Sequence, residues 1–146
     1  MATALIVYAS LTGNTEEIAD ILAESLEEQG VDIKECTSAT ADEFHDYDIC
    51  VVATYTYGTD GDLPDEIVDF YEELEEEDLT GKIYGALGSG DTFYDKFCQS
   101  VLDFDEQFAK TGATKGAENV LVDLNAEEED VKNIEAFAKS LVEKLG

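Results

Sequence analysis

Apolar residues follow two alternating patterns along the chain. Continuous apolar runs at 5–9 and 49–53 are typical of strands buried on both faces, and the alternation over 31–36 indicates an edge strand. Two further short strands are expected at 82–87 and 119–124. The pattern therefore predicts five strands, separated by longer segments.

Those longer segments carry apolar residues at helical spacing. Helices are expected at 14–29, from Pro64 through Leu74, at 94–110 and at 127–145. Gly30 ends the first helix, and proline suits the first turn of the second. The segment 40–47 is either a short helix or a crossover loop.

Strand–helix alternation over 146 residues predicts a single domain spanning 1–146. The expected fold is an α/β three-layer sandwich, with a parallel sheet between two layers of helices. In such sheets, ligands bind outside the carboxyl ends of the strands, where the strand order reverses. The loops after the first, third and fourth strands are therefore the expected site.

The charge balance excludes several classes of partner. The chain has 36 Asp and Glu residues against 8 Lys and no Arg, which gives a formal net charge of -28. Nucleic acids and anionic membranes require clustered cations, so neither is an expected partner. A basic protein surface is the natural complement, although the acidity could instead serve solubility or a high-salt cytoplasm.

The cysteines and the N-terminus bear on the compartment. Cys36, Cys50 and Cys98 are widely spaced and form no C-x-x-C pair, which favours buried thiols in a reducing compartment. The N-terminus lacks a signal-peptide pattern, and no apolar run approaches the about 20 residues needed to span a bilayer. We expect a cytoplasmic, monomeric protein.

The first strand runs directly into segment 10–15, which reads S-L-T-G-N-T. Hydroxyl and amide side chains at the start of a helix, together with its unpaired amides, bind anions. An ordinary N-cap also uses Ser or Thr, but four such side chains in six residues favour a phosphate. No Lys or Arg precedes Lys34, so the P-loop of nucleoside triphosphatases is excluded.

Two further loops combine aromatic residues with glycine. Segment 54–62 reads T-Y-T-Y-G-T-D-G-D after the third strand, and segment 88–94 reads G-S-G-D-T-F-Y after the fourth. Two aromatic faces can hold a flat ring system between them, while backbone N–H groups contact its polar edge. The two loops predict a planar ligand that also carries the phosphate.

These three motifs, in this order, resemble those of the flavodoxin family. Segment 10–15 resembles its phosphate loop, [ST]-x-T-G-x-T, while T-Y-G at 56–58 and the 88–94 segment resemble its two isoalloxazine loops. The resemblance covers the whole chain, and the lack of a long insertion after the fifth strand is similar to the short-chain subgroup. It implies a five-stranded parallel sheet of order 2-1-3-4-5 and one non-covalently bound FMN.

The resemblance also implies which residues bind FMN. The phosphate would be held by Ser10, Leu11, Thr12, Gly13, Asn14 and Thr15. The flavin would be held by Tyr55, Thr56, Tyr57, Gly58, Ser89, Gly90, Asp91, Tyr94 and Cys98. Tyr57 and Tyr94 would cover the two faces of the ring, and the Gly58–Thr59 peptide would reorient on reduction. The chain has no Trp, and Tyr57 stands where this family often has one.

The function implied is that of a low-potential one-electron carrier, which shuttles between oxidised, semiquinone and hydroquinone states. Its expected partners are redox proteins with basic surfaces, such as flavodoxin or ferredoxin reductases and oxidoreductases. The alternative is a small FMN-dependent quinone or azo reductase on the same fold, which would need a second pocket and usually longer loops. His45, the only histidine, has no expected catalytic role, and no metal site is expected.

Overall fold

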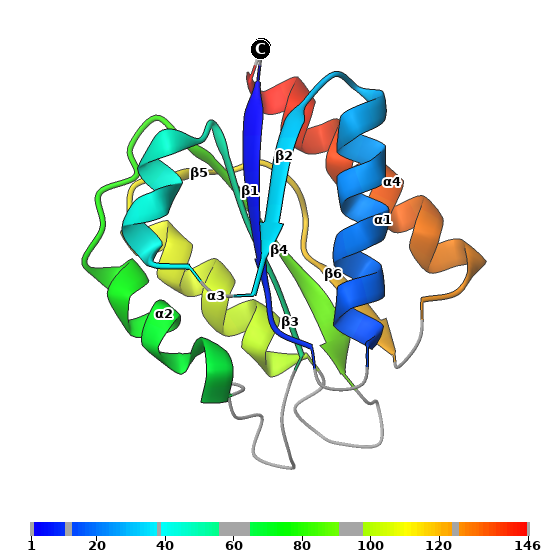
Figure 1. The fold of residues 1–146 in the computed structure, drawn as a ribbon, viewed down its shortest axis with the longest axis horizontal. Coiled ribbons are helices and arrows are strands. Elements are labelled where there is room, and N and C mark those ends of the chain that lie inside the picture. Colours follow the sequence, from blue (N-terminus) through cyan, green and yellow to red (C-terminus); the bar gives the residue numbers. More distant parts are fainter. Residues whose placement is uncertain are drawn as a thin grey trace.

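The computed structural model describes residues 2–10, 13–37, 39–55, 65–90, 98–123 and 126–145. Its strands are β1 Thr3–Tyr8, β2 Asp32–Cys36, β3 Ile49–Tyr55, β4 Ile83–Gly90, β5 Thr114–Lys115 and β6 Val120–Asp123. Its helices are α1 Asn14–Glu28, the 3-10 helix η1 Ala41–Asp46, α2 Asp65–Glu75, α3 Gln99–Lys110 and α4 Glu128–Leu145. Strands and helices alternate along the chain, as the hydrophobic pattern predicts (Figure 1).

The strands form one parallel sheet. Its order is β2-β1-β3-β4-β5, and β6 also pairs with β4. The predicted α/β fold and the order 2-1-3-4-5 are confirmed. Because β1 pairs with β2 on one side and with β3 on the other, the strand order reverses at β1. The carboxyl ends of β1 and β3 therefore border the position where such sheets bind ligands.

The fifth position of the sheet differs from the single strand predicted at 119–124. Two short strands, β5 and β6, occupy it, and the intervening segment leaves the ladder. Lys115 Nζ and Asn119 Nδ2 both donate to Asp105 Oδ2 of α3, at 2.8 and 3.0 Å. These two hydrogen bonds hold both ends of the segment between β5 and β6 against α3. The hydrophobic pattern of the sequence does not reveal these polar contacts.

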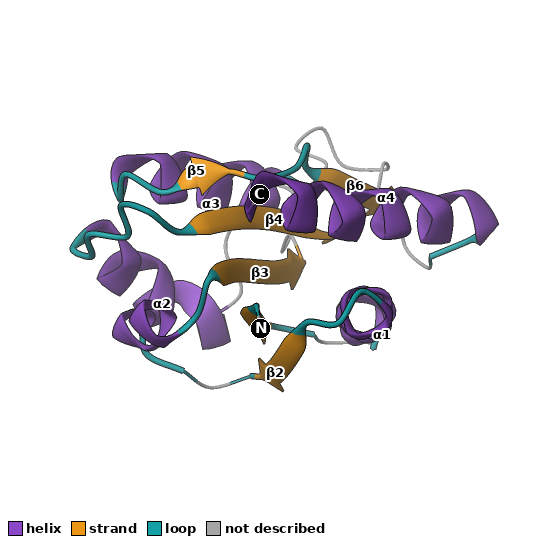
Figure 2. Cartoon of the chain, turned by 90° about the horizontal axis from the view of Figure 1, so that it is seen from above, coloured by secondary structure: helices purple, strands orange, loops and turns teal. Residues whose placement is uncertain are grey.

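A hydrophobic core covers each face of the sheet. Helices α1 and α4 pack on one face, where Leu22 and Phe137 are among the buried residues. Helices α2, α3 and η1 pack on the other, where Phe44 and Phe70 meet edge to face with ring centroids 5.5 Å apart. Figure 2 shows α1 and α2 on opposite sides of the sheet. Within the described ranges, no helix is long and apolar enough to cross a membrane.

Segment 40–47, which the sequence left open, contains the short helix η1. The backbone N–H of Thr40 donates to Glu43 Oε2 at 2.8 Å. The Glu43 side chain, in the first turn of the helix, thus gives a hydrogen-bond partner to the backbone of the residue that precedes the helix. Phe44 on this helix is fully buried. The capping contact and the buried ring explain why this crossover is helical.

Several predicted boundaries are wrong, and strand β1 begins at Thr3 and not at Leu5. Strands β3 and β4 run to Tyr55 and Gly90, beyond the predicted ends at 53 and 87, because their pairing continues past those positions. Helix α3 begins at Gln99 and does not run unbroken from 94, because Cys98 has a left-handed backbone with φ 54° and ψ 30°. Ser89 and Gly90 therefore belong to the end of a strand and not to a loop.

Candidate functional site

The carboxyl ends of β1, β3, β4 and β6 form one edge of the sheet. The ladder places Tyr8 beside Ala53, and two residues further along it places Tyr55 beside Ser89. Strand β4 extends furthest, with Gly90 paired to Asp123. This edge is therefore stepped: β1 ends first, β3 extends further, and β4 extends furthest toward the carboxyl side.

Helix α1 begins directly beside the low step. Gly13 precedes it with φ 94° and ψ -9°, and the Gly13 carbonyl accepts the first helical hydrogen bond from Glu17 at 3.0 Å. Positive φ costs glycine little, so the chain can turn sharply here. Among the residues that the structure describes, no side chain caps this end. The amides of Asn14, Thr15 and Glu16 are those that a helix leaves without intrahelical partners, and the helix dipole adds partial positive charge.

Ser10 organises the turn that leads to this helix. Its Oγ accepts a hydrogen bond from the backbone N–H of Gly13 at 3.1 Å. A hydroxyl that accepts in this way keeps its own proton for donation. We call Ser10, Gly13, Asn14 and Thr15 the α1 cradle; it offers neutral donors and no cation of its own.

Thr15 connects the α1 cradle to the centre of the sheet. Its Oγ1 lies 2.8 Å from the Oγ of Ser89, and both side chains are buried, with 1% and 4% of their surfaces exposed. Ser89 lies two residues after Leu87 on the same strand, so the side chains of Leu87 and Ser89 point to the same face of the sheet, which is the face that α1 covers. The first turn of α1 and the end of β4 thus share one hydrogen bond.

Cys98 is buried behind the end of β4. Its thiol lies 3.9 Å from the carbonyl oxygens of Gly88 and Val122. Burial raises the pKa of this thiol to about 12, so it is uncharged at neutral pH. An uncharged and fully buried thiol offers no charge to a ligand.

The structure brings together the described half of the predicted site. Ser10, Gly13, Asn14, Thr15, Tyr55, Ser89, Gly90 and Cys98 all lie at the carboxyl edge of the sheet or at the helix ends beside it. The other predicted residues lie outside the described ranges, namely Leu11, Thr12, Thr56, Tyr57, Gly58, Asp91 and Tyr94. The predicted pair of covering tyrosines and the reorienting Gly58–Thr59 peptide stay predictions.

Sequence reasoning missed one residue pair that shapes this edge, Thr54 and Gly88. The two are neighbours in the ladder, and a Cβ on Gly88 would collide with the carbonyl oxygen of Thr54. The side chain of Val101 would also crowd it, at 2.9 Å. Glycine inside an otherwise continuous strand was the available signal, because it often marks close backbone approach.

The surroundings of the α1 cradle are negatively charged. Burial is the largest of several causes that together raise the pKa of Glu35 on β2 to about 7; a hydrogen bond with Asp20 and the charges of Asp20, Glu27 and Glu16 on α1 are the others. Among the described lysines, Lys34 pairs with Glu43 and Lys115 with Asp105, both away from this helix end. Neither of these two lysines therefore supplies a cation to an anion bound at the α1 cradle.

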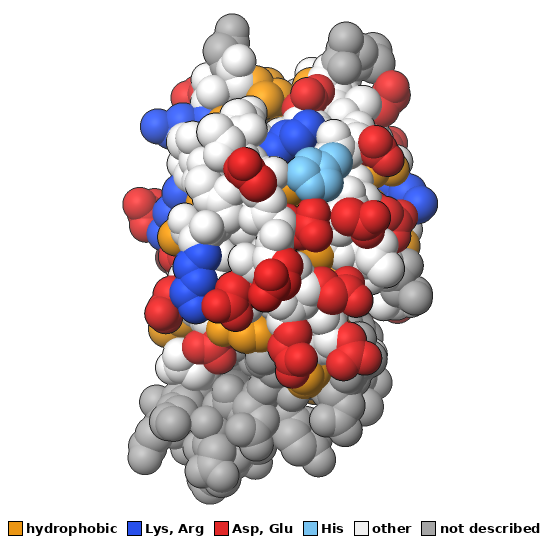
Figure 3. Space-filling view, turned by 90° about the vertical axis from the view of Figure 1, so that its left-hand side faces the viewer, with side chains coloured by type: hydrophobic (Ala, Val, Ile, Leu, Met, Phe, Trp, Pro, Cys, Tyr) orange, Lys and Arg blue, Asp and Glu red, His pale blue; other side chains and the backbone are white. Residues whose placement is uncertain are grey.

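A separate acidic surface lies on the α2 side of the molecule. Figure 3 shows carboxylates crowded over this face. Three of them make local contacts. Glu73 Oε1 accepts from Ala41 N at 3.2 Å, Glu77 lies 2.8 Å from His45 Nε2, and Asp78 accepts from Thr80. Three more carboxylates there are exposed: Glu72, Glu75 and Glu76.

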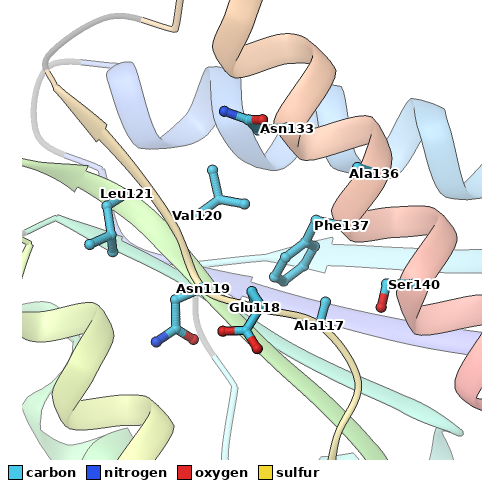
Figure 4. A pocket seen from close by; sticks show the side chains of 9 residues that line it. All are labelled: Ala117, Glu118, Asn119, Val120, Leu121, Asn133, Ala136, Phe137 and Ser140. Carbon is cyan, nitrogen blue, oxygen red and sulfur yellow. The ribbon is translucent and has the colours of Figure 1, made fainter.

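One pocket lies away from the carboxyl edge. It has a volume of about 380 Å³ and opens between the segment 117–121 and helix α4. Figure 4 shows Phe137, Val120 and Ala136 around it. None of the predicted site residues lines this pocket. Among the described residues, no group of acidic, histidine or cysteine side chains could hold a metal ion.

Comparisons with known proteins agree with this geometry. A family model described as flavodoxin matches residues 6–144. The structure of a flavodoxin from Streptococcus pneumoniae TIGR4 is 60% identical, with a TM-score of 0.93, over 98% of this chain and 99% of that one. A short-chain flavodoxin associated with a bacterial microcompartment is 45% identical, with a TM-score of 0.97, over the whole of both chains. Probable flavodoxin 1 of Bacillus subtilis is 41% identical over 97% of this chain and 91% of its own length.

Proposed function

The chain belongs to the flavodoxin family and is an FMN-binding electron carrier, and we propose that it is a low-potential carrier that serves basic redox proteins. When bound, FMN supplies the one-electron chemistry, and the protein provides binding, orientation and electrostatics. The proposal includes a monomeric protein in the cytoplasm. The observation that carries it is the α1 cradle beside the reversal of strand order.

The α1 cradle fits a phosphate monoester. Its donors are hydroxyls and amides at a helix end that no described side chain caps, and they suit the several acceptor oxygens of a phosphate. We assign the phosphate to this cradle together with Leu11 and Thr12. Because the donors are neutral, the binding energy comes from oriented dipoles, and salt should weaken it less than it would weaken an ion pair.

The flavin ring would lie over the stepped edge of the sheet. Gly90 and the backbone of Cys98 stand at the end of β4 and the start of α3, where N–H groups can contact a polar ring edge. Tyr55, Thr56, Gly58, Asp91 and the backbone of Ser89 complete the assignment, with Tyr57 and Tyr94 on the two faces. Stacked aromatic rings exclude water and favour a planar, uncharged ligand.

The low potential follows from charge. The chain carries a net charge of -28, and three Asp residues, Asp60, Asp62 and Asp91, neighbour the proposed ring loops in sequence. Negative charge added to the site by reduction is disfavoured by like charges and by poor solvation. Both effects make the reduced carrier a stronger electron donor.

The acidic surface of α2 supports docking to a basic partner. Glu72, Glu75 and Glu76 are exposed, whereas Glu73 and Glu77 contact η1 and so support the fold. Exposed charges of one sign steer an oppositely charged partner over long range and raise the association rate. The exposed carboxylates are therefore the proposed docking groups.

The test is a titration and a turnover assay on the purified protein. A carrier shows flavin absorption bands, accepts electrons in two separate one-electron steps, and does not turn over NAD(P)H with a quinone or an azo compound. Its electron exchange with a basic reductase slows as ionic strength rises. Turnover of a quinone or azo compound would instead support the reductase, and rates independent of salt would contradict the docking surface.

A further inference from the structure

Thr15 and Ser89 share one hydrogen bond. Phosphate binding at the α1 cradle would decide which of the two hydroxyls is the donor. A hydroxyl carries one proton and can accept two further hydrogen bonds, so either oxygen of this pair can be the donor. A phosphate oxygen can only accept. If Thr15 gave its proton to Ser89, it would have none left for the phosphate.

We propose that Ser89 is a positioning residue for the phosphate: its hydroxyl donates to Thr15, which turns the Thr15 proton outward toward the phosphate. The inference rests on the proposed phosphate site and gives the Ser89 side chain a role at the phosphate end of FMN, not at the ring. Hydrogen bonds in such a chain polarise one another, so each strengthens the next in a buried setting.

The surroundings of the pair support this role. Both side chains are almost fully buried, so water does not compete for the Ser89 proton. Ser89 lies within a strand that is paired on both sides, with Tyr55 of β3 and Val122 of β6, and this pairing fixes its position. The bond also holds the first turn of α1 on β4, so it orients the amides of that turn as well.

The experiment compares FMN with riboflavin, which has the same ring and no phosphate. Apoprotein is titrated with each flavin, and the dissociation constants are read from the quenching of flavin fluorescence. Ser89→Ala should raise the dissociation constant for FMN about tenfold, as expected for a bond to a charged group, and leave that for riboflavin within about twofold. In a Thr15→Val background, Ser89→Ala should change the dissociation constant for FMN by less than about twofold, because the hydrogen bond from Ser89 through Thr15 to the phosphate is already lost.

Thr54→Val is the matched control. Thr54 is a fully buried hydroxyl at the same edge of the sheet, but it donates to the carbonyl of Tyr55 at 3.2 Å and not to α1. The control should leave the ratio of the FMN and riboflavin constants unchanged. If Ser89→Ala does not fold by circular dichroism, Ser89→Cys takes its place, because a thiol is a weaker donor of similar shape.

Two outcomes would overturn the role of Ser89. One is an equal loss of FMN and riboflavin affinity, which would show a general effect on the strand or the ring. The other is an unchanged preference for FMN in the folded variant. A wild-type protein without any preference for FMN over riboflavin would contradict the phosphate site itself, so the two failures are distinguishable.

Discussion

The carbonyl oxygen of Thr54 occupies the space that a Cβ on Gly88 would need. These two residues are ladder neighbours in β3 and β4, near the stepped edge that carries the proposed flavin site. The close approach of the two backbones explains a glycine inside a buried strand. It also makes this position sensitive to the smallest side chain.

Gly88→Ala should destabilise the apoprotein by about 3 kcal/mol, because the new methyl group has no space and the strands must separate. The measurement is urea unfolding followed by circular dichroism. Gly30→Ala is the control, since a Cβ there meets open space and only its φ of 86° opposes it. The control should cost about 1 kcal/mol, and an equal loss in both variants would contradict the collision.

Glu35 should make stability fall as the pH rises toward neutrality. Burial raises its folded pKa to about 7, while an unfolded Glu titrates near about 4.3. The folded protein therefore holds a proton that the unfolded chain releases, so the contribution is complete below about pH 4 and lost by about pH 7. Glu35→Gln should be more stable than wild type at about pH 8, with a smaller difference at about pH 5.

Urea unfolding of the apoprotein across this pH range checks the prediction. Asp32→Asn removes an exposed carboxylate from the same strand and serves as the control for lost charge. If the control changes the pH profile as much as Glu35→Gln does, the cause is the overall acidity of the protein and not the half-buried position of Glu35.

Asp105 should have the opposite pH dependence. Burial alone would raise the pKa of this carboxyl, but hydrogen bonds from Lys115, Tyr84 and Asn119 outweigh burial and lower it. A lowered pKa stabilises the fold above the unfolded value, and this contribution is lost as the pH falls through the folded value. Asp105→Asn should cost about 1–3 kcal/mol at neutral pH, with a smaller loss below about pH 4.

Asp103→Asn is the control for this variant. Asp103 lies on the same helix and, within the described ranges, accepts a local bond from Gln99 at 3.0 Å. Its replacement should change the free energy of unfolding by about 0.5 kcal/mol or less. A comparable loss in the two variants would mean that helix charge, and not the tie to β5 and β6, is what matters.

Replacing the exposed carboxylates Glu72, Glu75 and Glu76 together by Gln should slow association with a basic redox partner several-fold at low salt. Stopped-flow electron transfer at several ionic strengths measures this. The control replaces Glu129, Glu135 and Glu143, three exposed residues of α4, by Gln. The two variants have equal net charge, so equal slowing would show that total charge, and not the α2 surface, steers the partner.

The sequence by itself determined the alternation of strands and helices, and it also predicted an anion-binding loop after β1. Both are local properties: periodicity marks which face of a segment is buried, and the residues around Gly13 carry their own turn and donors. The segment 10–15 could therefore be assigned before any strand was placed. The strand order followed only once three motifs were recognised together.

Only the tertiary structure decided which residues from distant segments act as pairs. Thr15 and Ser89 lie 74 positions apart, and neither residue type signals the other. The split of the fifth strand position involves the bonds to Asp105, and the ends of β3 and β4 are set by the pairing of Tyr55 with Ser89. Such contacts depend on how packed layers bring side chains and backbones together, which a pattern along one segment does not contain.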